Sequence, residues 1–383
     1  MNFLFASDSF KGSLSSERIA QLLTEAAREV FGDCSCCAIP MADGGEGTAQ
    51  AVLSACGGTW VPVRVRGPLG EPVEAGYGLL PTDPAAGRTE PSAVIEMASA
   101  SGLVLVPPAL RDPRNTSTFG TGELIAAALA AGIRNITIAI GGSATNDGGM
   151  GCMAALGVRF LDVGGKPLEG KGNDLAKVKT IDASGLLSAA REARFTVMCD
   201  VDNPLLGEDG ATHTFGPQKG AVPVIADELE QGMENYAAVL KRELGADTGF
   251  PGAGAAGGLG AALKIFLHAD MRSGAESVLD LAGFNAKATE ADLVITGEGR
   301  IDWQSAHGKV VSAVAKRCKA AGVPCIAICG GMGERAEEML SLVDSIAVTA
   351  PGPCSLEFAM EHAEELYKSA AVRTMRLLRI HNG

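Results

Sequence analysis

The sequence has few aromatic residues, few histidines and a shortage of basic side chains. Aromatic residues make up only 4% of the 383 residues, and the five histidines are too far apart in sequence to form a metal-binding pair. Zinc enzymes take histidine ligands at close spacing, so a zinc hydrolase is not supported. Lys and Arg number 32 against 45 acidic residues, which gives a net charge of −13. Nucleic acids and anionic membranes attract clustered basic residues, so neither is expected as a partner.

Long apolar runs and a basic N-terminal segment are also lacking. No stretch approaches the roughly 20 uninterrupted apolar residues of a membrane span. Residues 1–13 have no basic start, so we expect a first strand there and not a signal peptide. Several of the ten cysteines lie in apolar runs such as "VMCD" and "PCIAIC", where a reduced thiol behaves as a small hydrophobic side chain. We therefore expect a reducing, cytoplasmic environment.

Strand-like and helical segments alternate at both ends of the chain. At the N-terminal end, the expected elements are a strand at 1–7, an amphipathic helix at 15–31, a strand at 36–40, a helix at 48–57 and a strand at 60–67. The same alternation resumes near residue 291 and continues into a closing helix from residue 356. This alternation is typical of a parallel sheet with crossover helices.

The middle of the chain lacks this regular alternation of strand-like and helical segments. Its strand-like runs are separated by a Pro- and Gly-containing excursion at residues 81–92, and a long helix is expected at 225–243. A chain of this length favours two domains. We predict an α/β fold with a discontinuous, Rossmann-like three-layer parallel-sheet domain formed by residues 1–66 and 287–383. Residues 67–286 then form an inserted, mixed α/β domain.

Polar, glycine-containing loops follow several strands of the predicted discontinuous domain. A single acidic residue at such a position is more often a helix cap than a catalyst, but ligands of open α/β sheets gather at this edge. Several loops converging there predict a binding site. The candidate residues are Asp8, Ser9 and Lys11; Asp43, Gly44, Gly45 and Glu46; and Glu298, Arg300, Asp302, Ser305, His307 and Lys309.

The middle region supplies a matching set, beginning with "AIGGSATNDGGMG" at residues 139–151. Glycine-rich loops after strands can present backbone N–H groups to an anion. Further polar loops follow in "CDVDNPLLG" and "FGPQKGA". The candidates here are Gly141, Gly142, Ser143, Thr145, Asn146 and Asp147; Asp200, Asp202 and Asn203; Gln218 and Lys219; and Gly257 and Gly258.

This combination of residue types suits phosphoryl transfer. Carboxylates can hold Mg²⁺, Lys and Arg can neutralise phosphoryl oxygens, and a carboxylate near the acceptor hydroxyl can serve as general base. The predicted catalytic residues are Asp8, Lys11, Asp200, Arg300 and Asp302, and the predicted Mg²⁺ ligands are Asp43, Asp200 and Asp302. Which carboxylate is the base and which is a ligand stays open.

A cleft between the two domains is the expected place for this chemistry, because neither domain alone carries the full set of polar motifs. We expect Asn146 and Asp147 to face Asp8, Lys11 and Glu298 across a solvent-filled crevice. Closure of the domains over substrate would keep water from hydrolysing the phosphoryl donor.

A literal GxGxxG, "GAGAAG" at residues 252–257, raises a dinucleotide-binding alternative. The motif indicates a nicotinamide site only between a strand and a helix. Here the preceding residues, "LGADTGFP", end a helix and include a proline. The expected context is therefore absent, and this interpretation is the weaker one.

The polar motifs together resemble bacterial type I glycerate kinase. "SDSFKGSLSS", "PMADGGEGT", "IGGSATNDGGMG", "CDVDNPLLG", "FGPQKGA", "PGAGAAGGLGAAL" and "TGEGRID" occur in the same order and span nearly the whole chain. The resemblance implies ATP-dependent phosphorylation of D-glycerate, with 2-phosphoglycerate as the expected product, and a two-domain α/β fold with its site between the domains. The alternatives are an NAD-dependent hydroxy-acid dehydrogenase and a non-enzymatic small-acid binding protein. Whether the chain forms a homodimer stays open.

Overall fold

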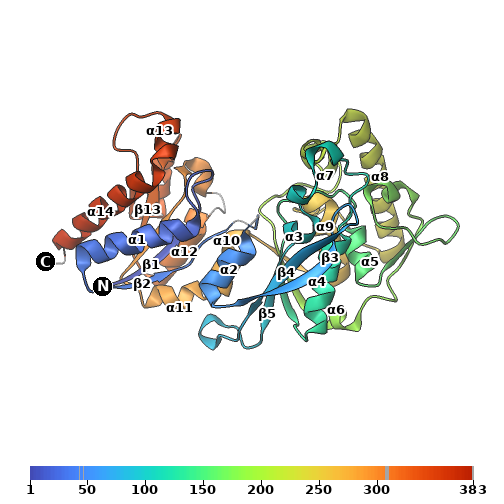
Figure 1. Ribbon diagram of the computed structural model, residues 1–383, viewed down its shortest axis with the longest axis horizontal. Coiled ribbons are helices and arrows are strands. Elements are labelled where there is room, and N and C mark those ends of the chain that lie inside the picture. The colour runs from blue at the N-terminus through green and yellow to red at the C-terminus, as the bar shows by residue number, and fades with distance from the viewer. Residues whose placement is uncertain (43, 46, 307–309, 382–383) are drawn as a thin grey trace.

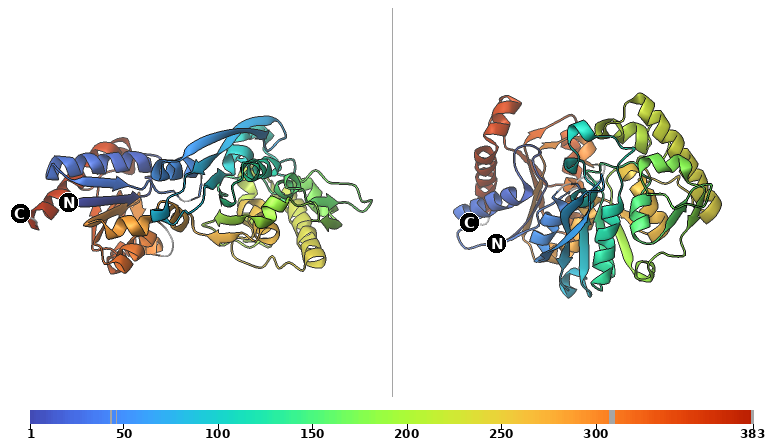
Figure 2. Two further views of the ribbon diagram at one scale, coloured as in Figure 1. Left: turned by 90° about the horizontal axis from the view of Figure 1, so that it is seen from below. Right: turned by 45° about the vertical axis from the view of Figure 1, so that its right-hand side comes forward.

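The computed structural model describes residues 1–42, 44–45, 47–306 and 310–381. Two lobes lie side by side, and each is built around its own β-sheet (Figures 1 and 2). Both ends of the chain lie in the same lobe, which we call the smaller lobe. The predicted α/β class is confirmed, because both lobes combine parallel strands with covering helices.

The smaller lobe contains a five-stranded sheet in the order β15-β13-β11-β1-β2, with every neighbouring pair parallel. Its strands come from both ends of the chain. Their bounds are β1 Asn2–Ser7, β2 Ser35–Ala38, β11 Leu293–Gly297, β13 Cys325–Cys329 and β15 Ser345–Val348.

Helices cover both faces of this sheet, so its central strands are apolar on both sides, as parallel sheets require. Phe3 and Phe5 of β1 belong to the apolar cluster under α1 (Ser16–Phe31) and α14 (Ala363–His381). Leu4 and Ala6 point to the opposite face, into the cluster that includes α12 (Val310–Ala321). Ser15 caps α1 by accepting a hydrogen bond from the Arg18 backbone N–H at 3.2 Å, as its position before an apolar periodic run suggests.

The larger lobe contains a six-stranded, mixed sheet in the order β10-β9-β6-β5-β4-β3. Strands β5, β6, β9 and β10 are parallel neighbours, whereas β4 is antiparallel to both β3 and β5. The bounds are β3 Thr59–Arg66, β4 Pro72–Leu80, β5 Ser92–Glu96, β6 Asn135–Ala139, β9 Arg194–Met198 and β10 Asp270–Arg272.

Strand β3 lies in a different sheet from the one that the alternating pattern predicted. The pattern grouped it with the first two strands, but it forms an antiparallel hairpin with β4 of the larger lobe. The connection explains the difference. The turn between these strands is closed by the Gly67 N–H donating to the Glu71 carbonyl at 2.6 Å, and so short a link cannot carry a parallel crossover.

Helices and short ladders complete the larger lobe. The long helix predicted at 225–243 is present as α8. The helices are α3 Ala98–Ser101, α4 Phe119–Ala130, α5 Met150–Ala155, α6 Ser188–Glu192, α7 Ala211–Phe215, α8 Pro223–Leu244 and α9 Ala255–Leu267. One two-stranded ladder pairs β7 (Arg159–Leu161) with β8 (Thr180–Asp182), and a second, in the smaller lobe, pairs β12 (Arg300–Ile301) with β14 (Gly331–Met332).

A continuous apolar cluster joins the two lobes. It contains Leu4 of β1 and Val294 of β11 from the smaller lobe, together with Val94 of β5 and Met198 of β9 from the larger one. The helices α2 (Thr48–Cys56), α10 (Gly274–Leu281) and α11 (Phe284–Thr289) contribute to it, and α2 and α10 lie at the junction (Figure 1). None of the described helices is both long and apolar enough to cross a membrane.

Candidate active site

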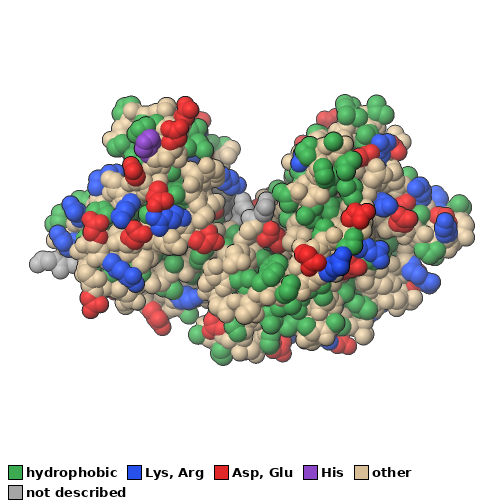
Figure 3. Space-filling view, viewed as in Figure 1, with side chains coloured by type: hydrophobic (Ala, Val, Ile, Leu, Met, Phe, Trp, Pro, Cys, Tyr) green, Lys and Arg blue, Asp and Glu red, His purple; other side chains and the backbone are tan. Residues whose placement is uncertain are grey.

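A cavity of about 970 Å³ opens at the carboxyl edge of the five-stranded sheet. The residues that follow strands β1, β11, β13 and β15 all line it, within 8–13, 298–300 and 330–332 and at Thr349. The chain leaves neighbouring β1 and β11 in opposite directions across the sheet, and such a switch point is where open parallel sheets bind ligands. The surface is hollowed between the lobes (Figure 3), and Asp200 of the larger lobe completes the lining.

Two cationic side chains, Lys11 and Arg300, line this cavity, and both are exposed to it. Lys11 lies in a tight turn closed by reciprocal backbone hydrogen bonds between Phe10 and Leu14, of 2.8 and 3.0 Å. Arg300 opens β12, where a Cβ placed on Gly333 would come within 2.8 Å of its Nε. Glycine at that position therefore leaves room for the guanidinium. Both cations suit an anionic ligand.

Three carboxylates lie in the same cavity: Asp8, Glu298 and Asp200. The Asp8 N–H donates to the Gly297 carbonyl at 2.9 Å, so the β1–β11 ladder holds Asp8 beside the residue after β11. Its Oδ1 accepts from the Ser9 N–H at 2.7 Å. Glu298 is 8% exposed. Carboxylates and cations thus meet at one sheet edge, where a bound cation and a phosphate can share them.

Asp200 reaches the cavity from the larger lobe, just after β9. Its Oδ1 accepts a hydrogen bond from the Gly274 N–H at 3.0 Å, at the first residue of α10. The partial positive charge of the helix N-terminus attracts an acidic side chain at this position. The position of Asp200 therefore depends on α10, which lies at the junction of the lobes.

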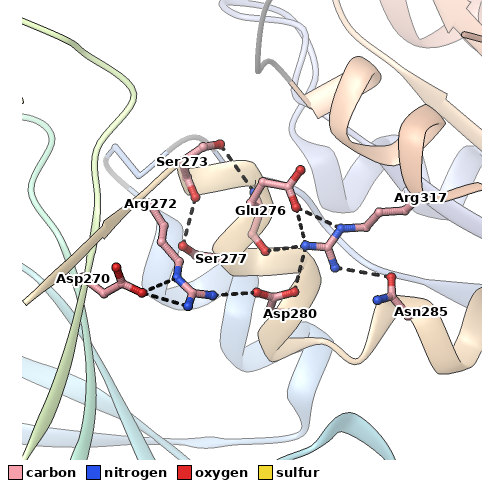
Figure 4. A network of polar contacts seen from close by, with 8 residues as sticks. All are labelled: Asp270, Arg272, Ser273, Glu276, Ser277, Asp280, Asn285 and Arg317. Atoms are coloured by element: carbon pink, nitrogen blue, oxygen red, sulfur yellow. Dashed lines mark hydrogen bonds and ion pairs between the residues drawn. The ribbon is translucent and has the colours of Figure 1, made fainter. Parts of the chain in front are cut away.

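A network of ion pairs ties α10 to both lobes (Figure 4). From α12 of the smaller lobe, Arg317 contacts Glu276 with Nε at 2.9 Å and Asp280 with Nη2 at 2.7 Å. From β10 of the larger lobe, Arg272 contacts Asp280 at 3.2 Å. Ser273 caps the helix by accepting from the Glu276 N–H at 3.5 Å. These contacts restrain the helix whose N-terminus holds Asp200.

The chain matches a family model described as "Glycerate kinase family" over residues 3–379. It is 46% identical over 375 residues to a glycerate kinase from Bacillus subtilis (strain 168), covering 97% of this chain and 96% of that protein. This chain belongs to the glycerate kinase family. It is also 46% identical over 333 residues to a glycerate 2-kinase from Escherichia coli (strain K12), covering 87% and 86% of the two chains.

A solved structure agrees with this assignment. The crystal structure of a protein assigned as glycerate kinase 2 from Salmonella typhimurium LT2 superposes with a TM-score of 0.87 at 43% identity, covering 100% of this chain and 99% of that one. Membership of the family identifies this protein as a kinase, as the polar motifs and their order predict. The two alternatives, a dehydrogenase and a non-enzymatic binding protein, are therefore not supported.

The structure brings together six of the predicted site residues in this cavity. They are Asp8, Ser9, Lys11, Asp200, Glu298 and Arg300.

A second group of predicted site residues, all glycines, lies at the lobe junction, where the Gly141 N–H donates to the Gly44 carbonyl at 3.1 Å. A Cβ on Gly141 would come within 2.8 Å of the Gly45 Cα. Glycine at position 141 thus permits close contact between the two glycine-rich loops.

Asn146 and Asp147 do not face a solvent-filled crevice, contrary to expectation, because both are completely buried in the larger lobe. The Asp147 carboxylate accepts hydrogen bonds from the Thr118 N–H and hydroxyl, at 2.7 and 2.8 Å, and from the N–H groups of Gly149 and Gly151. Burial raises the pKa of Asp147, and these hydrogen bonds oppose that shift. Its observed contacts are those of a structural carboxylate.

Lys219 is buried beside the same loop, with 2% of its surface exposed. Its Nζ donates to the Thr145 carbonyl at 2.7 Å. Burial lowers the pKa of Lys219 to about 7, because the interior disfavours the charged ammonium. Asn146 donates to the Thr212 hydroxyl at 3.2 Å, whereas its Oδ1 has no hydrogen-bond partner among the described residues. Ser143 is also buried, and Gly142 is exposed.

Gly257 and Gly258 pack α9 against this loop. Both have left-handed backbone conformations, with φ of 67° and 91°. A Cβ on Gly257 would lie 2.1 Å from the Thr145 carbonyl oxygen, and one on Gly258 would lie 2.8 Å from the Gly148 Cα. Close backbone packing therefore accounts for both glycines. The described stretch 245–254 before α9 contains no strand, as expected for a motif outside a dinucleotide fold.

Three other predicted residues stabilise turns and are not among the described residues that line the cavity. Asp302 accepts from the Gln304 N–H at 2.9 Å, and the buried Ser305 hydroxyl accepts from the Asp302 N–H at 3.1 Å. Asn203 donates to the Asp209 carbonyl at 2.7 Å. Hydrogen bonding within turns accounts for these contacts. The predicted site residues Asp43, Glu46, His307 and Lys309 lie outside the described residues.

The sequence patterns missed Glu96, at the end of β5. Both of its carboxylate oxygens accept from the Gly47 N–H at 3.1 Å, and Oε2 accepts from the Ala49 N–H at 3.2 Å. Glu96 thus caps α2 from the larger lobe and holds the adjoining loop at the junction. An acidic residue closing the otherwise apolar run "SAVIE" was the available signal, and its partner lies 47 residues earlier in the chain.

Proposed function

We propose that this protein transfers the γ-phosphoryl group of ATP to D-glycerate, forming 2-phosphoglycerate, in the cavity at the carboxyl edge of the five-stranded sheet. The observation that carries the proposal is the meeting of Lys11 and Arg300 with Asp8, Asp200 and Glu298 around one cavity. Phosphoryl transfer requires cations for the phosphoryl oxygens and carboxylates for a metal ion and the acceptor hydroxyl. The names of the relatives support glycerate as the acceptor.

In this proposal, Lys11 and Arg300 neutralise charge on the transferred phosphoryl group or on the glycerate carboxylate. Asp200 either takes the proton of the acceptor hydroxyl or holds a metal ion. Its hydrogen bond to the Gly274 N–H at the N-terminus of α10 fixes the carboxylate at the edge of the cavity, where both roles require it.

Mg²⁺ fits the residues present. Enzymes that use ATP commonly hold this ion with one or two carboxylates, with phosphate oxygens and water supplying the other ligands. Asp200, together with Asp8 or Glu298, would serve in this way, and the ion would neutralise charge on the phosphates. Of the predicted ligands, Asp302 is engaged in a turn and Asp43 lies outside the described residues. No three His, Cys, Asp or Glu side chains lie close enough together to hold a metal ion by themselves among the described residues.

We also propose that the two lobes are separate domains, with the one nearer the chain ends Rossmann-like and discontinuous. Sheet membership supports this division, since residues 2–38 and 293–348 supply one sheet and residues 59–272 supply the other. A site at their junction, with Asp200 on one side and Lys11 on the other, allows closure over bound substrate.

The test is an assay of ADP release with D-glycerate, ATP and Mg²⁺, with the product identified by phosphorus NMR. Lys11→Ala and Arg300→Ala should each lower kcat by about 100-fold, because a charge contact to the transition state is lost. Arg64→Ala is the matched control, since Arg64 is exposed on β3. Absence of glycerate-dependent ADP release would contradict the proposed reaction, and wild-type turnover in both variants would contradict the proposed roles.

A further inference from the structure

One wall of the cavity is apolar and open to solvent. Leu356, Met332 and Met360 line it and have 77%, 49% and 40% of their surface exposed. Leu356 and Met360 belong to α13 (Leu356–Glu361), and Met332 ends β14. Isolated exposed apolar residues are common, but three large ones facing a single cavity mark a binding surface.

Smaller and buried groups extend this wall into the cavity. Ala359 and Ala363 line it beside Met360, and Phe10, which is 6% exposed, also belongs to the lining. The Phe10 ring packs edge-on against Tyr367 of α14, with ring centroids 5.3 Å apart. The wall is therefore backed by a packed aromatic pair, and its small side chains leave room for a ligand.

The apolar wall adjoins the cationic part of the cavity. A Cβ on Gly12, next to Lys11, would lie 3.1 Å from the Met360 Cε, so the turn carrying Lys11 touches α13. Gly12 has a φ of 81°, which a larger residue adopts only with strain. A ligand that is charged at one end and apolar at the other fits this arrangement.

The size of the cavity also points to such a ligand. At about 970 Å³ it lies near the upper end of the volumes of small-molecule sites. Glycerate has only three carbons, and its carboxylate and hydroxyls would lose hydration without compensation against methionine and leucine. The apolar wall thus requires a different occupant from the acceptor.

We propose that the adenine ring of ATP packs against Leu356, Met360 and Met332, which places the base on the smaller lobe. This inference rests on the proposed function. Methionine side chains adapt to flat aromatic rings and make favourable sulfur–aromatic contacts. The triphosphate then extends towards Lys11 and Arg300, and the acceptor lies on the side of Asp200.

The test compares binding of ADP with binding of inorganic tripolyphosphate, measured by calorimetry without turnover. A double variant that combines Leu356→Gln with Met360→Gln removes the apolar contact without adding charge. ADP should bind at least about tenfold more weakly, whereas tripolyphosphate affinity stays unchanged, because it has no base. Leu377→Gln is the control, since Leu377 is 70% exposed on α14 and lies outside the described cavity lining.

Unchanged ADP affinity in the double variant would overturn the assignment, as would equal weakening of ADP and tripolyphosphate. A wild-type protein that fails to bind ADP would overturn it as well. A protein that binds ADP through this wall but does not phosphorylate glycerate would contradict only the proposed reaction and leave the base site established.

Discussion

Asp147 and Asp200 both follow strands of the larger sheet, yet they lie in opposite environments. Asp147 is fully buried and accepts hydrogen bonds from Thr118 and from two glycine N–H groups, whereas Asp200 is exposed in the cavity at the N-terminus of α10. A buried carboxylate surrounded by donors stabilises its loop, and an exposed one can exchange its partners for a ligand. Burial thus separates a structural role from a chemical one.

The buried Lys219 should make the free energy of unfolding depend on pH. Burial lowers its pKa to about 7, well below the ordinary lysine value near 10.4. Between these values the unfolded chain binds more protons than the folded one, so this lysine makes the free energy of unfolding rise with pH above 7. Relative to Lys219→Met, the wild-type protein should gain on the order of 1 kcal/mol per pH unit between pH 7 and 9.

Urea unfolding of both proteins at each pH measures this difference. Buried thiols such as Cys329 change the stability with pH in the opposite direction, because burial raises the pKa of the Cys329 thiol to about 12. The comparison of the two proteins cancels this contribution, since both contain the same thiols. Lys241→Met is the control, because Lys241 is exposed on α8 and should leave the pH dependence unchanged. A constant difference between wild type and Lys219→Met would show that Lys219 titrates normally.

At the scale of elements, α10 is a short helix that determines where Asp200 lies. It has eight residues, too few to be stable alone, and tertiary contacts hold it. Arg317 joins it to α12, and Arg272 joins it to β10 (Figure 4). The helix therefore connects the two lobes through charged side chains at the point where Asp200 enters the cavity.

A double-mutant cycle on Arg317→Gln and Glu276→Gln should give a coupling energy on the order of 1 kcal/mol in the free energy of unfolding. The Arg317 side chain is only 15% exposed, so water screens this pair less than a surface pair. Arg64→Gln with Glu74→Gln is the matched cycle, since those side chains are 72% and 77% exposed, and its coupling should be near zero. Equal coupling in both cycles would contradict the restraint of α10 by Arg317.

At the scale of the whole molecule, the lobes share an apolar cluster. Leu53 of α2 is 5% exposed within it and approaches Gly78 of β4, while Leu4 and Val294 of the smaller sheet belong to the same cluster. Because unfolding either lobe would expose this shared surface, we expect the two lobes to unfold together.

The two tryptophans allow a direct test, because Trp60 lies in β3 of the larger lobe and Trp303 lies after β12 of the smaller one. The single variant Trp303→Phe retains Trp60 as a probe of the larger lobe, and the single variant Trp60→Phe retains Trp303 as a probe of the smaller lobe. The urea midpoints of these two variants should coincide. Leu53→Ala should lower the free energy of unfolding by about 2–4 kcal/mol in both backgrounds, because it leaves a cavity in the shared core. Separate midpoints, or a shift in only one lobe, would indicate independent unfolding.

Local patterns by themselves determined the α/β class, the amphipathic helix α1 and the convergence of Lys11, Glu298 and Arg300 at one sheet edge. These features follow from side-chain periodicity and from the rule that parallel strands end at a common edge. The order of the polar motifs also indicated a glycerate kinase, which the family match confirms.

Only the tertiary structure decided which polar residues face solvent and which sheet each strand joins. Strand β3 pairs with β4 because the intervening turn is too short for a crossover. Asn146 and Asp147 lie in the core, and α9 packs against their loop through Gly257 and Gly258. Lys219 is buried beside the same loop and donates to its Thr145 carbonyl, so the burial of these residues depends on chain segments distant in sequence. For the same reason, the apolar wall of the cavity combines Phe10 with Met360, 350 positions apart in the chain.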